Sequence, residues 1–384
     1  MPNPARRNVL ARWIAVFLVV YHAGCGGTLL PGEEQDDFDG DLDESDEQLD
    51  ERQVSGAPPF RLYVAHGGND GADGRWSGAP LATLAGAQAR LRSYLPTINR
   101  NVEIRIAYDG GKAYRGQEVV WSHMSPDHTI SFMPSDYGPG MRLSDIAGRP
   151  LFDGKSLCEK KAPETSKSAG EHCKFFVIDG RSRPASRLRF YYLSITHYTT
   201  TGIALHNSGE GRNVVYGCKF MKIGNLYFPK QRAGYTAIGI SSSDHNRIRN
   251  NHFVDIRNKV ADNRFMHAVY MNVLSSDNTV TYNNVLRVSG DPFKVRHYSN
   301  RNRITHNTLR YAGVAAFLDW PEGGRKECFS WENVFSNNAI HCGYNGTKSA
   351  TVKLRPPPEP DNGNPLCVPL GKRVRSSGNT VSCP

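Results

Sequence analysis

The chain has 384 residues, 39% of them hydrophobic, and a formal net charge of +10. Twelve of its 37 acidic residues lie between residues 33 and 52, so residues 53–384 carry 43 basic and only 25 acidic side chains. A domain this basic favours polyanionic partners, and the lack of helix-turn-helix, zinc-finger and RNA-binding motifs argues against nucleic acid.

Residues 1–25 indicate export. Three arginines precede the apolar run Trp13–Val20, and small residues follow up to Cys25. This order is typical of a signal peptide rather than of a membrane-spanning helix. The segment ending at Cys25 resembles a bacterial lipoprotein signal, which implies that Cys25 is lipidated and anchors the protein to a membrane. His22 departs from that pattern, so ordinary cleavage and release into the periplasm or the medium is the alternative.

Residues 26–56 are predicted to be a disordered acidic linker. The twelve acidic side chains repel one another, and the segment has almost nothing apolar to bury. Such a segment suits a tether that holds a folded domain away from a surface.

The folded part opens with a strand, a glycine-rich loop and a helix. The helix is predicted at 82–94, where apolar residues recur at helical spacing, and Pro96 ends it. The loop is interpreted as a plain turn; calcium binding is the alternative, although the ligand register of an EF-hand is missing. The strands are predicted at 60–64, 102–107, 118–121 and 129–132, and the alternative calcium ligands are Asn69, Asp70 and Asp73.

A repeated pattern, Asn-x-apolar-x-x-Asn-x-apolar, dominates the second half of the chain. The copies follow one another at 33, 32, 24 and 31 residues, a period typical of a solenoid. The apolar residues two and seven positions after the leading Asn are expected to point inward. The Asn five positions after it is expected to lie at a turn, where amides of successive repeats bond to one another. The copies begin at Asn213, Asn246, Asn278, Asn302 and Asn333, and the expected ladder comprises Asn251, Asn283, Asn307 and Asn338.

Eight cysteines fit an oxidising compartment. Cys218 is predicted to be a buried thiol, because it takes the place of the inward Asn in later repeats. No CxxC or Cys/His spacing predicts zinc. Proximity in sequence predicts the disulfides Cys158–Cys173, Cys328–Cys342 and Cys367–Cys383.

The solenoid period, the asparagine ladder and the helix near the start together resemble the pectate-lyase-like superfamily. The resemblance implies an all-β fold, a right-handed parallel β-helix solenoid with an N-terminal capping helix. It covers residues 57–345, and residues 346–384 are predicted to be a C-terminal extension. The fold alone does not identify an activity, because proteins of this kind include lyases, hydrolases, epimerases and adhesins.

A second strand precedes each Asn-led segment, and its alternation predicts an outward-facing sheet. Longer repeats add basic and aromatic side chains beside this sheet, which predicts a basic groove suited to acidic sugars. The side chains expected inside are Ile238, Ile240, Val269, Met271, Phe293 and Val295. Those expected outside are Tyr270, Asn272, Lys294, Arg296, Ala315 and Phe317, with Asp319 near a strand end and Tyr227, Arg232 and Arg264 on the inserts.

Lys294 and Arg296 suggest β-elimination of a uronic-acid chain. Lys294 would remove the proton on C5, since a fixed positive neighbour lowers the pKa of a lysine, and Arg296 would neutralise the substrate carboxylate. Tyr270 and His267 are candidate acids toward the leaving oxygen, and Asn272, Asp319, Tyr227, Arg232 and Arg264 are candidate substrate contacts. A lysine base with an arginine helper resembles alginate and chondroitin lyases, although there the two residues come from different rungs.

Plainer interpretations stand beside this one. Lys294 and Arg296 would be ordinary solvated residues, His267 a turn histidine bonded to backbone, and Asp291 a turn residue. Calcium is a candidate cofactor, because related lyases use it and Asp291 lies near the pair.

We therefore predict an exported, monomeric polysaccharide lyase with an acidic polysaccharide as its partner. A non-catalytic surface protein that binds polyanionic glycan is the alternative. The paired Asp-Asp and His-Gly segments of polygalacturonases are missing, which argues against glycoside hydrolysis.

Overall fold

The computed structural model describes most of the chain after residue 56. The predicted signal peptide with Cys25, the predicted linker, and the parts of the inserts that contain Arg232 (229–234) and Arg264 (259–264) lie outside the described residues. None of the described helices is long and apolar enough to cross a membrane. The described ranges are 57–94, 98–125, 127–161, 173–179, 186–228, 235–258, 265–321, 327–356 and 367–383.

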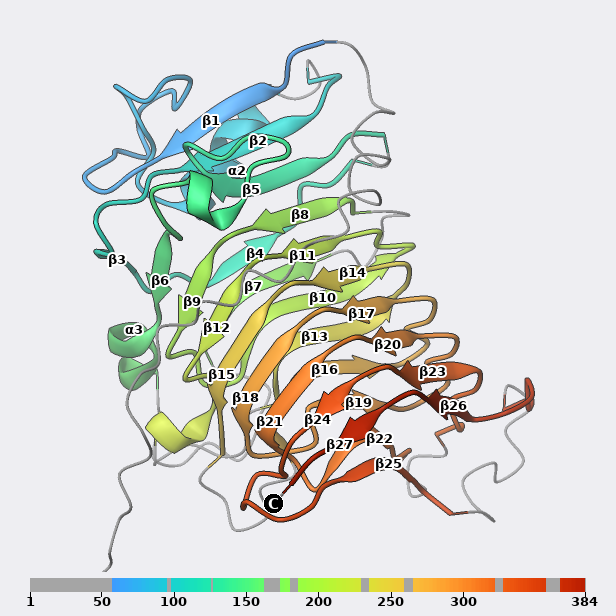
Figure 1. Ribbon diagram of the computed structural model, residues 1–384. Helices are drawn as coiled ribbons and strands as arrows, with labels where there is room; N and C mark the ends of the chain where they lie inside the picture. Colours follow the sequence, from blue (N-terminus) through green and yellow to red (C-terminus); the bar gives the residue numbers. More distant parts are fainter. Residues whose placement is uncertain are drawn as a thin grey trace, which may run out of the picture. The chain divides into compact units, whose positions relative to one another are not determined.

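Three parallel sheets make up the domain (Figure 1). Sheet A contains β1 (Phe60–Val64), β2 (Val102–Ile106), β5 (Ile130–Pro134), β8 (Leu188–Tyr191), β11 (Val214–Tyr216), β14 (Arg247–Arg249), β17 (Thr279–Thr281), β20 (Arg303–Thr305), β23 (Asn333–Ser336) and β26 (Val374–Ser377).

Sheet B contains β3 (Ala113–Arg115), β6 (Leu151–Asp153), β9 (Ser194–Thr196), β12 (Lys219–Met221), β15 (His252–Ile256), β18 (Asn284–Val288), β21 (Thr308–Ala312), β24 (Ala339–Ile340) and β27 (Thr380–Val381). Sheet C contains β4 (Val119–Trp121), β7 (Lys174–Asp179), β10 (Thr201–Gly209), β13 (Thr236–Ser243), β16 (His267–Asn272), β19 (Phe293–Val295), β22 (Ala315–Asp319) and β25 (Ala350–Leu354).

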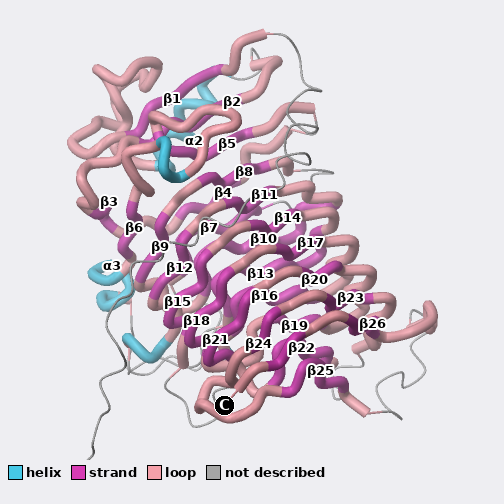
Figure 2. The backbone as a smooth tube through the Cα atoms, in the orientation of Figure 1, coloured by secondary structure: helices cyan, strands magenta, loops and turns pink. Residues whose placement is uncertain are grey.

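Each turn of the chain adds one strand to every sheet, as β10, β11 and β12 do before the chain returns to sheet C at β13. Figure 2 shows the strands of each sheet stacked along the solenoid. The predicted fold is confirmed, a right-handed parallel β-helix. The few helices are α2 (Leu84–Tyr94), α3 (Lys155–Lys160) and the 3-10 helices η2 (Leu143–Asp145) and η4 (Asn225–Tyr227).

The repeat predicts the core correctly. The residues two and seven positions after each leading Asn are at most 1% exposed, as expected for apolar side chains that stack along a solenoid. They are Val215, Phe220, Ile248, Phe253, Val280, Val285, Ile304, Leu309, Phe335 and Ile340.

The predicted asparagine ladder is also present. The side-chain amide of Asn251 donates to the Oδ1 of Asn283 at 3.0 Å, Asn283 donates to Asn307 at 2.9 Å, and Asn307 donates to Asn338 at 3.0 Å. Asn338 continues the ladder to Asn379 at 3.0 Å. Each buried amide is thus paired, which removes the cost of burying it.

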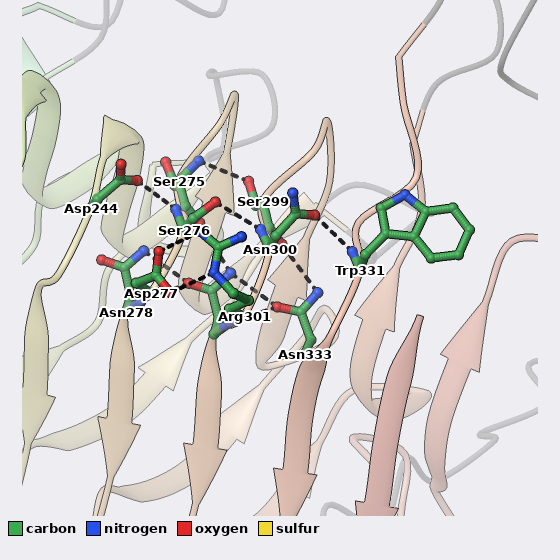
Figure 3. A network of polar contacts seen from close by, with 11 residues as sticks. Asp244, Ser275, Ser276, Asp277, Asn278, Ser299, Asn300, Arg301, Trp331 and Asn333 are labelled. Carbon is green, nitrogen blue, oxygen red and sulfur yellow. Dashed lines mark hydrogen bonds and ion pairs between the residues drawn. The ribbon is translucent and has the colours of Figure 1, made fainter. Parts of the chain in front are cut away.

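A second ladder was not predicted. The leading asparagines, which served only to mark the repeat, bond to one another in the same way, from Asn213 through Asn246, Asn278 and Asn302 to Asn333, at 2.7 to 3.1 Å. Serines and further polar residues stack beside them in the turns that precede sheet A (Figure 3). Two rows of amides therefore hold the rungs in register on either side of sheet A.

The predicted capping helix is α2. Its apolar face, with Leu84, Ala87 and Leu91, is fully buried in the core. Asp70 accepts the backbone N–H groups of Ala82 and Thr83 at 2.9 Å, so it holds the chain at the start of the helix. Within the loop, Asn69 Oδ1 accepts the backbone N–H of Gly71 at 2.9 Å and Asp73 Oδ1 accepts that of Arg75 at 3.0 Å, as in the plain turn interpretation.

The β-helix continues beyond residue 345, so the predicted boundary is wrong. β25, β26 and β27 pair in parallel with β22, β23 and β24 and form a further rung. The sequence concealed this rung because an irregular, proline-rich segment interrupts it.

The same rung explains the disulfides. Cys158–Cys173 is confirmed, and Cys218 is a buried free thiol as predicted. The other two predicted pairs are wrong, because the bonds are Cys328–Cys367 and Cys342–Cys383. Their separations of 39 and 41 residues correspond to one turn of the solenoid, like the 41 residues between the ladder partners Asn338 and Asn379. Spatial neighbours in a solenoid lie one rung apart rather than close in sequence.

Replacing Cys342 and Cys383 by serine is expected to lower the free energy of unfolding by about 4 kcal/mol, because the bond closes a loop of this length in the unfolded chain. Denaturant titration of both forms measures the difference. Peptide mapping of the unreduced protein checks the pairing, and a peptide that links Cys328 to Cys342 would contradict it.

Candidate functional site

The outward face of sheet C brings the predicted site residues together. The alternation of β13, β16 and β19 is as predicted, because the six side chains expected inside are at most 1% exposed. Tyr270 and Lys294 lie opposite each other on adjacent strands, and the Lys294 Nζ atom is 5.2 Å from the centre of the Tyr270 ring. Both side chains are partly exposed on this face.

Arg296 lies beside them but is already engaged. Its side chain is 6% exposed, and its guanidinium binds the Glu327 carboxylate through two nitrogens, with 2.8 Å between Nε and Oε2. A third nitrogen donates to the Tyr270 hydroxyl oxygen at 3.0 Å. Arg296 therefore holds the phenol in place, while Glu327 balances its charge. This burial excludes the plain interpretation of Arg296 as an ordinary solvated residue.

Glu327 was missed by the sequence analysis. It lies 31 residues after Arg296, which is the length of one repeat, so the period could have suggested that the two are neighbours. Its side chain is buried, and removing one partner of a buried pair leaves an uncompensated charge.

His267 is neutral and buried. Its Nδ1 is 2.6 Å from the backbone oxygen of Asp291, so Nδ1 carries the proton and Nε2 carries the lone pair. Burial, together with the nearby positive charges of Lys294 and Arg296, holds the pKa of His267 well below its ordinary value. A ring in this state has no proton on Nε2 to donate, so the geometry favours Tyr270 over His267 as the acid.

Asp291 shapes the turn next to the site. Its Oδ1 accepts the backbone N–H groups of Val314 and Ala315 at 3.0 and 2.7 Å. Burial raises the pKa of Asp291, and the ammonium groups of Lys294 and Lys353 oppose this rise. Within the described ranges, no three His, Cys, Asp or Glu side chains gather in a way that could hold a metal ion.

Lys353 is a further candidate residue that the sequence did not reveal. Lys294, Leu318 and Lys353 occupy one outward row, because each lies opposite the next across β19, β22 and β25. Two strand spacings, about 10 Å, separate the two lysines along this row. Lys353 belongs to this row because β25 continues sheet C beyond β22.

The predicted orientation of β22 is wrong. Phe317 lies opposite the inward Phe293 and is fully buried, so Asp319 points inward as well and is 1% exposed. Asp319 accepts hydrogen bonds from Arg373, one of them at 2.6 Å, and burial raises its pKa to about 6 against the effect of Arg373. The expected substrate contact through Asp319 is therefore contradicted by its burial.

The remaining predicted contacts lie in different places. Asn272 is partly exposed on sheet C and accepts the backbone N–H of Val273 at 2.9 Å. Tyr227 lies in η4, where its hydroxyl binds Arg257 at 3.0 Å and its ring meets His197 edge to face. Tyr227 thus belongs to a cluster beyond the ends of the sheet B strands.

On β10 and β13, the outward positions of sheet C carry small residues that are buried. Ala204 and Gly239 lie opposite each other there, next to Thr236 and His206. A Cβ atom on Gly239 would come within 3.1 Å of the Thr236 methyl and 3.5 Å of the His206 Nε2. Burial, assisted by the charge of Lys174, lowers the pKa of His206 to about 4, so this histidine is uncharged at neutral pH.

His206 is expected to make the fold sensitive to acid. Because unfolded His206 binds a proton near its ordinary pKa of about 6.5 and folded His206 only near 4, stability falls as pH drops through this window, by up to about 3 kcal/mol. His206→Gln should reduce this loss. The free energy of unfolding measured at about pH 7, about pH 5 and about pH 4 brackets the window and gives the difference. The same change at the exposed His306 is the control, and equal pH dependence of both variants would contradict the assignment.

Comparisons with known proteins give structural likenesses at low identity. No protein-family model and no curated protein sequence matches the chain. Among solved structures, a pectate lyase, Pel9A, is similar with 14% identity, a TM-score of 0.41 and 78% of each chain covered. The lacto-N-biosidase of Eubacterium ramulus is similar with 11% identity, a TM-score of 0.39 and coverage of 88% of this chain and 70% of that one. A rhamnogalacturonan lyase shows 12% identity, a TM-score of 0.32 and coverage of 84% and 65%. These identities are too low to transfer an activity from one chain to another.

Proposed function

We propose that this protein is an exported lyase that cleaves an acidic, uronate-containing polysaccharide by β-elimination. The observation that carries the proposal is the pairing of Tyr270 with Lys294 on the outward face of sheet C, with the phenol oxygen held by Arg296. Three disulfides and a basic start that resembles a signal peptide are consistent with export.

Each of these residues has a defined part in the reaction. Lys294, in its unprotonated form, takes the proton from C5 of the uronate, and the electron pair forms the double bond between C4 and C5. The bond from C4 to the glycosidic oxygen breaks, and the Tyr270 hydroxyl donates its proton to that oxygen. The Arg296 hydrogen bond occupies a lone pair of the phenol oxygen, so the phenol proton is directed elsewhere.

Neutralisation of the substrate carboxylate is reassigned from Arg296 to Lys353. Arg296 already binds Glu327, whereas Lys353 lies in the same outward row as Lys294. A positive charge near the carboxylate stabilises the negative charge that develops when C5 loses its proton.

A non-catalytic glycan-binding protein is the second candidate, favoured by the outward row of Lys294 and Lys353, whose charges serve binding of an acidic glycan without any proton transfer. Incubation with alginate, pectate and a glycosaminoglycan separates the two. Ultraviolet absorbance of unsaturated uronate ends supports the lyase. Binding without such absorbance on any of these substrates supports the second candidate and rejects the first.

The lipid anchor is a separate part of the proposal. The segment ending at Cys25 is the only feature that supports it. Mass spectrometry of the mature N-terminus distinguishes a lipidated Cys25 from an unmodified, cleaved end. Calcium dependence is tested by repeating the assay with a chelator.

A further inference from the structure

Sheet A carries a row of arginines on its outward face. Across successive strands, Val214, Arg247, Thr279, Arg303, Val334 and Arg375 lie opposite one another. From β14 onward an arginine therefore occupies every second strand of this row. We call Arg247, Arg303 and Arg375 the arginine row.

The arginine row faces solvent, away from the core. Ile248 and Ile304, the neighbours of Arg247 and Arg303 along the chain, are fully buried, so the arginines point the opposite way. All three arginines are exposed. Arg189 continues the same register on β8, but it is only 9% exposed, so the accessible row begins at Arg247.

The spacing of the row is fixed by the backbone. Neighbouring strands lie about 4.8 Å apart, so consecutive arginines of the row are about 10 Å apart along the axis of the solenoid. The asparagine ladders on both sides of sheet A hold this register. Because the scaffold fixes the spacing before a ligand binds, the protein backbone loses little conformational entropy on binding, and the main entropy loss is that of the ligand.

The charge of this face is strongly one-sided. The seven strands from β8 to β26 contain five arginines and no aspartate or glutamate. Acidic residues occur only in the turns, where Asp277 pairs with Arg301 and Glu332 pairs with Arg375. Glu332 thus engages Arg375, and Thr279 lies between Arg247 and Arg303 in the row.

We propose that the arginine row binds an extended acidic polysaccharide along the solenoid axis, as a second and non-catalytic site. The inference takes its ligand class from the proposed function but concerns a different sheet. A single exposed ion pair contributes little, so binding depends on several evenly spaced contacts to one polymer. The row itself contains no aromatic side chain, but the exposed ring of Tyr282 follows β17 and is stacked on His306, so single-stranded nucleic acid is the competing ligand that the test includes.

The test compares two pairs of substitutions in the full chain carrying Lys294→Ala, so that the polymer is not degraded. One variant has Arg247→Ser and Arg303→Ser, and the matched control has Lys219→Ser and Arg310→Ser on sheet B. We expect the first to bind alginate or a sulfated glycosaminoglycan up to about tenfold more weakly and with less dependence on salt. The control should stay within about twofold of its parent.

Equal losses in both double variants would show that only net charge matters and would overturn the proposal. Tighter binding of single-stranded DNA than of either glycan, with the same dependence on Arg247 and Arg303, would overturn the ligand class. Lack of lyase activity in the unmodified protein rejects the proposed function but leaves this binding result valid. If the unmodified protein has lyase activity but the Arg247→Ser and Arg303→Ser variant binds glycan as its parent does, the second binding site is rejected and the proposed function stands.

Discussion

Replacement of Lys294 by alanine is expected to lower the rate of unsaturated uronate formation by about 10²- to 10⁴-fold, the usual contribution of a general base. The amine lies opposite Tyr270 on the neighbouring strand, so the change removes the proposed base and leaves the proposed acid. Lys294 is partly exposed and lies outside the core, so the fold should tolerate the change. The rate of absorbance increase on a soluble uronate polymer, with protein of verified fold, measures the effect.

Two further variants make this result specific. Lys294→Arg keeps the positive charge but is too basic to accept a proton near neutral pH, so it should be almost as inactive as the alanine variant. Lys219→Ala on sheet B makes the same change in charge and should retain activity. Full activity of Lys294→Arg would show that Lys294 supplies only charge, and full activity of Lys294→Ala would exclude it as the base.

Replacement of Asn283 by alanine is expected to cost about 3 to 5 kcal/mol of unfolding free energy. Its Oδ1 accepts the backbone N–H and the side-chain amide of Asn251, both at 3.0 Å. Its Nδ2 donates to the backbone oxygen of Ile248 and to the Oδ1 of Asn307. All of these partners are buried, so the substitution leaves several polar groups without hydrogen bonds and without water.

The adjacent Asn284 provides a matched control. It points outward on sheet B and is partly exposed, so Asn284→Ala should change stability by less than about 0.5 kcal/mol. Urea titration of both variants, followed by circular dichroism, gives the comparison. Similar midpoints would mean that the ladder contributes little and that apolar stacking alone holds the rungs.

The sequence predicted through its register which candidate site residues face outward on β16 and β19. Once the Asn-led repeat was recognised, alternation alone placed Val269 and Met271 inside and Tyr270 outside, and the structure agrees. Such an inference works because side chains in a strand alternate strictly, so the direction of one determines that of its neighbours. The failure at Phe317 and Asp319 has the same basis, since β22 was assigned with the opposite alternation.

The alternation of side chains could not predict the hydrogen-bond partners or the protonation of the candidate site residues. Whether Arg296 is available depends on Glu327, which lies one turn later in a segment without the repeat. Whether His267 can donate a proton depends on its hydrogen bond to Asp291 and on its burial. The proposed role of Lys353 depends on a strand that the pattern did not reveal.

The sequence by itself determined the β-helix, its inward residues, one amide ladder and the position of Tyr270 and Lys294. These features repeat along the chain, because a solenoid applies the same local geometry to each rung. Only the tertiary structure decided the pairing of Arg296 with Glu327, the disulfides of the last rung and the inward turn of Asp319. Those contacts join particular residues one rung apart, and their partners depend on how many residues each turn contains, which varies from rung to rung.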